Sequence, residues 1–288
     1  MNALQAPFRP VAESMEAQAR IAFSKAPSGA TYISQQEVGY PFHLGRTLKL
    51  PDDPAGMAAV YLQSCSGGIF AGDNLHVRLN AGPGSQAHVS TGAATVVHSM
   101  LEQSAHQTVS LIAEAGALLE YLPLTTILFP RTRLHSQVNV TLHPQAIVML
   151  SDAFCFHTPQ GANDEFGHYR ADMEVRSPCG HLLAGDRLAI NGEDLRRHLP
   201  GVSDEFEALA TFMLIGRGLP VDKLKAALRD ALSGLPGSYV GVSALPNDCG
   251  ISSRIMGADA VVLRNALHAA WACARQHLTG IKPRVRRK

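Results

Sequence analysis

Paired cysteines, a strong net charge and long apolar runs are all missing from this sequence. Its five cysteines are odd in number and form no Cys-x-x-Cys pair, so neither a disulfide framework nor a structural zinc site is supported, which fits a reducing cytoplasm. The formal net charge of +1 gives no electrostatic case for nucleic acid or an acidic membrane surface. No apolar run approaches membrane-spanning length, and residues 1–10 lack the apolar core of a signal peptide. We therefore expect a cytoplasmic protein without nucleic-acid or membrane partners.

Catalytic signatures are also missing. The sequence has no Gly-x-x-x-x-Gly-Lys-(Ser/Thr) phosphate loop, no Gly-x-Gly-x-x-Gly after a strand, no His-Glu-x-x-His and no Gly-x-Ser-x-Gly elbow. The thirteen histidines are spread along the chain without a ligand-like pair, which indicates surface or sheet residues rather than metal ligands. These absences favour a protein that is not an enzyme and that binds no cofactor tightly.

The stretch at 60–74 organises the rest of the chain. It begins as a strand and then turns on three glycines, Gly67, Gly68 and Gly72. Glycines this close together predict a backbone with positive φ or with close approach to a neighbour. The apolar pair Ile69-Phe70 predicts that the turn is packed, and Asp73 follows it directly. The turn either delivers the Asp73 carboxylate to a site or is a tight β-turn whose Asp caps its own backbone.

A weak repeat with a spacing of about 31 residues follows this stretch. Copies begin at Val77, Val109 and Val140, and a degenerate fourth copy begins at Met173. Each copy has an alternating strand, a turn of small residues and a more apolar return strand. Stacked strand–turn–strand units bury a common face. The fold class is therefore mainly β, either solenoid-like or a layered sandwich, and the imperfect copies do not separate these two architectures.

An α+β pattern replaces the repeat in the C-terminal part. We predict strands at Ala208–Ile215, Ser238–Leu245 and Ile251–Met256, and two helices at Val221–Leu232 and Ala258–Leu278. The expected organisation is a loose arm at 1–18, one domain at 19–280 and a basic tail at 281–288. Within that domain the β body extends to about residue 200 and the α+β cap covers 205–280.

Two carboxylates on glycine-flanked turns are candidates for chemistry. Asp73 follows the first turn, and Glu165 lies in the second, at 161–167. Facing each other, they would form an acid/base pair, which makes a small β-rich hydrolase the alternative function. They fit weak metal ligands or simple turn formers equally well.

Several stretches then match, in order, one known family. They are Ser66-Gly-Gly-Ile-Phe-Ala-Gly-Asp73, Ser90-Thr-Gly-Ala-Ala-Thr95, Leu119-Glu-Tyr-Leu-Pro123, Glu165-Phe166, Asp186-Arg187, Ser253-Arg-Ile-Met-Gly257 and the closing helix ending in Arg275-Gln-His-Leu-Thr-Gly280. This series resembles the urease accessory protein UreD, also called UreH, from about Ala19 to Gly280. The resemblance gives motif or structural positions to Gly67, Gly68, Gly72, Thr91, Tyr121, Pro123 and Arg187. The chain departs from the family pattern at Gly92, at Val96 and across Thr158–Asn163.

The resemblance implies a β-helical scaffold with two helices that takes part in urease maturation. UreD proteins bind UreF, which recruits the GTPase UreG, and the complex docks on the apo-urease subunits to deliver nickel. Nickel in transit is the implied metal, and Asp73 and Glu165 are the expected points along its path. The UreF side is expected on the last helix, at Leu263, Leu267, Trp271 and Arg275.

Overall fold

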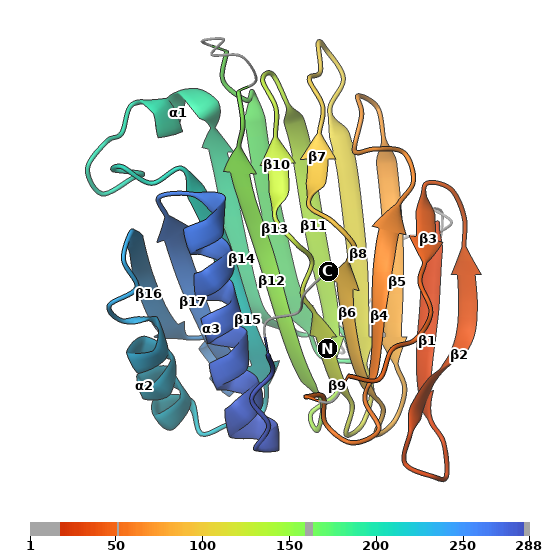
Figure 1. The fold of residues 1–288 in the computed structure, drawn as a ribbon. Helices are drawn as coiled ribbons and strands as arrows, with labels where there is room; N and C mark the ends of the chain where they lie inside the picture. The colour runs from red at the N-terminus through yellow and green to blue at the C-terminus, as the bar shows by residue number, and fades with distance from the viewer. Residues whose placement is uncertain (1–17, 51, 159–163, 285–288) are drawn as a thin grey trace, which may run out of the picture.

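Two stacked β-sheets form the body of the protein (Figure 1). The structure is a computed structural model that describes residues 18–50, 52–158 and 164–284. The seven-stranded sheet has the order β14 (Leu182–Asn191), β13 (His168–Arg176), β11 (Arg133–Leu142), β8 (Ala105–Ala113), β5 (Asn74–Ala81), β1 (Ala19–Lys25) and β2 (Thr31–Val38). The ten-stranded sheet has the order β16 (Ser238–Ala244), β17 (Gly250–Gly257), β15 (Ala208–Gly216), β12 (Ile147–Phe156), β9 (Leu118–Tyr121), β6 (Gln86–Thr91), β4 (Ala58–Ser64) and β3 (Phe42–Leu44). Beside this path, β10 (Thr126–Leu128) pairs with β12 and with β7 (Thr95–Val97).

The predicted repeat is the stacking unit of the two sheets. The first strand of each copy (β5, β8, β11 and β13) enters the seven-stranded sheet and pairs in parallel with the strand of the next copy. The return strands β6, β9 and β12 pair in parallel in the ten-stranded sheet. Successive copies therefore stack as in a solenoid, and the mainly β, solenoid-like prediction is confirmed.

The register of the third copy differs from the prediction. Val109 pairs with Val77 on one side and with Val138 on the other, whereas Val140 pairs with Leu111. The shift is two residues, so the same side chains face the interior, because side chains alternate between the faces of a strand. The Val-x-Val pattern at 138–140 satisfies either register equally.

Apolar side chains from both sheets fill the space between them. The inner rows include Val77, Val109 and Val138 on one sheet and Val89, Leu119 and Val148 on the other, all buried. The opposite face of the ten-stranded sheet is apolar as well, and helices α2 (Val221–Leu232) and α3 (Ala260–Thr279) cover it. The strands of the predicted α+β cap thus continue the ten-stranded sheet at its β15–β17 end.

Helix α3 has clear end signals. The Asp259 carboxylate accepts hydrogen bonds from the amides of Val261 and Val262 at 2.7 and 2.8 Å, and Gly280 ends the helix with a φ of 73°. These caps place both ends within two residues of the predicted helix. The short helix α1 (Gly192–Arg196) was not predicted, and a 3-10 turn at Pro246–Asp248 joins β16 to β17.

Candidate functional site

An interior cavity of about 510 Å³ lies between the two sheets. The glycine turn contributes Gly67, Gly68 and Ile69 to its wall. Further lining residues come from the end of β6 and the segment through β7, from the inner faces of β8 and β11, from the end of β9 and the segment after it, and from β12: Thr91, Gly92, Val96, Gln107, Ser136, Tyr121, Pro123 and Asp152. Residues of the first three motifs therefore meet at one cavity, although they lie on different elements.

Gly68 explains why the turn needs glycine. Its φ is 148°, and a Cβ at this position would lie 2.4 Å from the backbone oxygen of Val96. The close approach lets Ile69 form a bridge with Val97 and lie buried, whereas Phe70 is 42% exposed and stacks on His98 with ring centroids 4.4 Å apart. Only half of the predicted apolar pair is therefore packed inside.

Asp73 closes this turn and is not among the residues that line the cavity. Its Oδ2 accepts a hydrogen bond from the Phe70 amide at 2.8 Å, and its own amide donates to the Phe70 carbonyl at 3.1 Å. The observed contacts are those of the turn-capping alternative.

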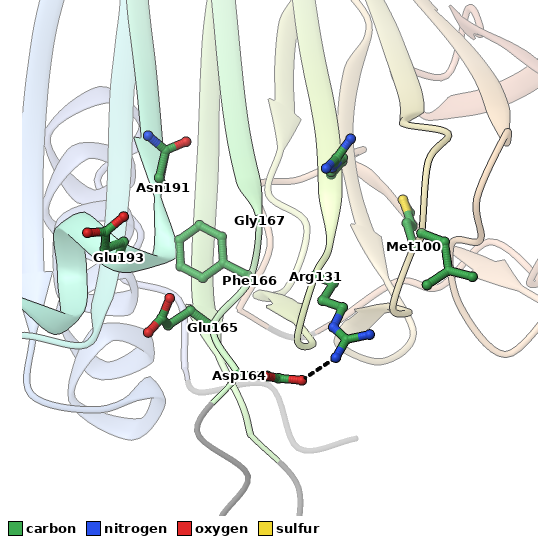
Figure 2. Close-up of a pocket in the computed structure, with 10 residues that line it drawn as sticks. Met100, Arg131, Asp164, Glu165, Phe166, Gly167, Asn191 and Glu193 are labelled. Carbon is green, nitrogen blue, oxygen red and sulfur yellow. Dashed lines mark hydrogen bonds and ion pairs between the residues drawn. The ribbon is translucent and has the colours of Figure 1, made fainter.

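Glu165 lies in a different hollow, which opens at the surface and has a volume of about 480 Å³. Figure 2 shows it beside Asp164 and Phe166, with an ion pair of 2.8 Å between Arg131 and Asp164. The Glu165 carboxylate pairs with Arg196 Nε at 2.5 Å. Because Asp73 is absent from the lining of this hollow, the acid pair on which the hydrolase alternative depends is not assembled.

Asp152 is the carboxylate that does line the interior cavity. Tyr169 donates its hydroxyl to both carboxylate oxygens, at 3.0 and 2.8 Å. Burial raises the pKa of Asp152, and the nearby charge of Asp186 raises it further, although the hydrogen bond from Tyr169 and the charge of Arg254 oppose the shift. Asp186 and Arg254 pair with each other at 2.6 Å. The sequence reasoning missed Asp152, and its signal was an acid inside an otherwise apolar strand.

The other motif positions divide between the cavity and the outer surface. Thr91 fixes the segment that bounds the cavity, because its hydroxyl accepts from the Leu124 amide at 2.9 Å and donates to the Ala93 carbonyl at 3.0 Å. The side chain of Arg187 is 74% exposed and faces Asp172 and Glu174, so it lies outside the cavity. The departures at Gly92 and Val96 line the cavity, and most of the third, at 159–163, lies outside the described residues.

A second cavity, of about 140 Å³, lies beneath α3 and shares part of its wall with the first. Pro123, Leu124 and Ser151 line both cavities. The shared wall lies where β9 ends after Tyr121 and β10 begins at Thr126, so strand pairing in the ten-stranded sheet is interrupted there. On the α3 side the second cavity is lined by His88, Ser90, Arg264, Leu267, His268 and Trp271, among others.

Buried charges fix α3 against the sheet. Glu120 and Arg275 are both fully buried; Arg275 Nε donates to Glu120 Oε1 at 2.8 Å and its Nη1 pairs with Asp53 at 2.6 Å. Trp271 Nε1 and His88 Nδ1 also bond to the Glu120 carboxylate, at 3.1 and 2.7 Å. Burial alone would raise the pKa of Glu120, but the hydrogen bonds from His88 and Arg275 lower it to about 2.

The predicted UreF side of α3 needs a correction. Leu263, Trp271 and Arg275 are 0%, 6% and 0% exposed, because this face of the helix packs on the ten-stranded sheet of its own chain. Leu267 is half-buried and lines the smaller cavity. These residues hold the helix in place and offer little surface to a partner.

The described residues form neither a cluster of metal ligands nor a membrane-spanning helix. Among the described residues, no group of three or more His, Cys, Asp and Glu side chains is placed to hold a metal ion. No helix in the described part of the chain has the length and apolar character needed to cross a membrane.

Comparison with known proteins identifies the family. The model of the UreD urease accessory protein matches residues 15–288. The chain is 73% identical to urease accessory protein UreD 1 of Pseudomonas syringae pv. tomato, over 95% of this chain and 96% of that protein. It is 32% identical to UreD 1 of Methylorubrum populi, over 98% and 96%, and 31% identical to UreD of Natronomonas pharaonis, over 84% and 80%. With this match over nearly its whole length, the chain belongs to the UreD family of urease accessory proteins.

Proposed function

We propose that this chain delivers nickel to apo-urease through its interior, in a complex with UreF and the GTPase UreG. Membership of the UreD family gives the coarser role, which is urease maturation. The observation that carries the finer proposal is the pair of cavities that share Pro123, Leu124 and Ser151, with the Asp152 carboxylate inside the larger one. A conduit needs an opening on each side, and these two cavities lie on opposite sides of the ten-stranded sheet.

The chemistry of the larger cavity suits transient passage. Its polar lining includes the carboxylate of Asp152, the hydroxyls of Ser136 and Tyr121 and the amide of Gln107, together with the thiol of Cys65. Oxygen ligands of this kind bind Ni²⁺ more weakly than thiolates or clustered imidazoles, so the ion is released readily. A cation beside Asp152 would also offset the cost of burying that charge. The chain has no phosphate-binding loop, so in this proposal GTP binds to UreG alone.

Replacing Asp152 with Asn tests the proposal. The variant keeps the shape and an acceptor for Tyr169 but removes the charge, so it should leave the fold and the recovery of UreF in pull-downs unchanged. We expect the nickel content and the activity of co-expressed urease to fall several-fold. Asp164→Asn is the matched control, because Asp164 lies in the surface hollow and is half exposed. Full nickel loading with Asp152→Asn would contradict passage past this carboxylate.

A second variant tests the route. Ser151 is buried in the wall that both cavities share, so Ser151→Leu should narrow the connection. Urease nickel should fall in this variant while the far-ultraviolet circular dichroism remains that of the wild type. Ser110→Leu places the same side chain on the outer face of the seven-stranded sheet and should have no effect on loading. Equal loading by both variants would argue against this route.

A further inference from the structure

Two histidines lie side by side on the outer face of the seven-stranded sheet, away from the interior cavity. His106 on β8 and His135 on β11 are direct partners in the parallel register, and Asn74 on β5 pairs with His106 on its other side. Their strand neighbours Gln107 and Ser136 line the interior cavity, so the two imidazoles point outward, since successive side chains alternate between faces. Residues far apart in sequence are thus brought to adjacent positions by the stacking of the repeats.

The two rings lie at a chelating separation. Their centroids are 5.7 Å apart and their planes are inclined by 67°. Two imidazoles that share an ion at about 2.1 Å from each nitrogen have centroids roughly 4.5 to 6.5 Å apart. The His106 side chain is exposed and its imidazole hydrogen-bonds to none of the residues that the structure describes, so the ring can turn toward its neighbour.

His135 has a carboxylate partner of the kind that metal-bound histidines commonly have. Its Nε2 hydrogen-bonds to Asp172 Oδ2 at 2.7 Å. With Nε2 as the donor in this bond, the lone pair of Nδ1 is free to bind a metal ion. Metal-bound histidines commonly donate their second ring nitrogen to a carboxylate, which fixes the tautomer and makes the ligating nitrogen more basic. Arg170 Nε holds the same Asp172 oxygen at 2.7 Å from the other side.

We propose that His106 and His135 form a surface site for a borderline divalent cation such as Ni²⁺ or Zn²⁺, with Asp172 as a positioning residue and water completing the coordination. Imidazole ligands select Ni²⁺, Cu²⁺ and Zn²⁺ over Mg²⁺ and Mn²⁺. With two protein ligands the site binds more weakly than a structural zinc site and exchanges its ion readily. The inference does not depend on passage through the interior, because it concerns the opposite face of this sheet.

The test is Ni²⁺ binding by the tag-free full chain in the absence of urease. Calorimetry should show that His106→Ala and His135→Ala each weaken one binding event at least tenfold, and that excess Mg²⁺ does not compete for it. Asp172→Asn should weaken the same event roughly tenfold, as loss of an outer-shell partner usually does. His181→Ala, at an exposed histidine in the turn before β14, should bind as the wild type does. Asp152→Asn should also leave this event unchanged, which separates it from the interior route.

A spectroscopic readout locates the ion directly. Paramagnetic Ni²⁺ at substoichiometric amounts should broaden the ring signals of His106 and His135 before those of the other histidines. Zn²⁺ added afterwards should restore these signals by displacing the nickel. Wild-type affinity in the His106→Ala/His135→Ala double variant, or broadening confined to other histidines, would overturn the proposal.

Discussion

At the scale of single residues, the carboxylate of Asp73 stabilises the turn in which it lies. It holds the Phe70 amide at 2.8 Å, and this hydrogen bond fixes the loop whose glycines line the cavity. The charge is not needed for that contact, since an amide oxygen accepts the same hydrogen bond.

We expect Asp73→Asn to fold with nearly wild-type stability, whereas Asp73→Ala should lower the free energy of unfolding by about 1 kcal/mol. Urea unfolding measures the difference. Urease nickel should stay at the wild-type level with Asp73→Asn, in contrast to Asp152→Asn. If urease lost nickel when co-expressed with a folded Asp73→Asn variant, the Asp73 charge would be needed for nickel transfer, as the sequence analysis predicts.

At the scale of elements, α3 is held by buried charge as well as by apolar packing. Glu120 comes from β9 and Arg275 from the last turns of the helix, and both lie out of contact with water. A charge left without its partner at such a position is costly, whereas an apolar replacement of both partners is often tolerated.

Glu120→Gln and Arg275→Met should therefore each lower the free energy of unfolding by about 3 to 5 kcal/mol. The double variant should lose less stability than the sum of the two single losses, because neither Glu120 nor Arg275 then remains buried without the other. A double-mutant cycle by urea unfolding measures this coupling, with soluble yield as a second readout if a single variant fails to fold. Additive losses would mean that the two side chains act independently.

The same pair predicts an acid dependence. The pKa of Glu120 is lowered from 4.5 to about 2 in the folded chain, so the folded state binds its proton less readily than the unfolded state. The stability that Glu120 contributes is therefore complete above about pH 4.5 and is lost as the pH falls toward 2. Urea midpoints measured from pH 5 to pH 2 should fall more steeply for the wild type than for the Glu120→Gln/Arg275→Met variant. Parallel curves would exclude this carboxylate as a source of the acid sensitivity.

At the scale of the whole molecule, the two sheets share one apolar interior while α2 and α3 cover the outer face of the larger sheet. The single tryptophan, Trp271, lies on α3 and contacts Glu120 on β9. Its fluorescence therefore reports on the docking of the helix, whereas far-ultraviolet circular dichroism reports mainly on the sheets.

We expect both signals to change in one coincident urea transition, as the interpretation of 19–280 as one domain predicts. A control comes from the Glu120→Gln variant, in which loss of the charged partner of Arg275 should move the fluorescence midpoint at least as far as the dichroism midpoint. A fluorescence change well before the dichroism change in the wild type would mean that the helical cap unfolds separately.

Local signals in the sequence determined much of this architecture. The alternating strands after residue 74, the small-residue turns between them and the caps of α3 are all properties of neighbouring residues, so periodicity and capping rules locate them. The glycine requirement at Gly68 was also readable, because crowded glycines indicate backbone that approaches another segment closely. The absence of catalytic motifs agreed with an accessory role.

Tertiary structure decided which of these residues meet. The sequence marked Asp73 and Glu165 by their turns, but only the stacking of the two sheets shows that Asp152 points into the cavity and that the other two acids do not line it. Arg275 looked like a surface residue on a helix, and its burial depends on Glu120 and Asp53 from distant segments. The adjacency of His106 and His135 likewise follows from strand register. Burial and contact across sheets depend on pairing between remote segments, which no local pattern specifies.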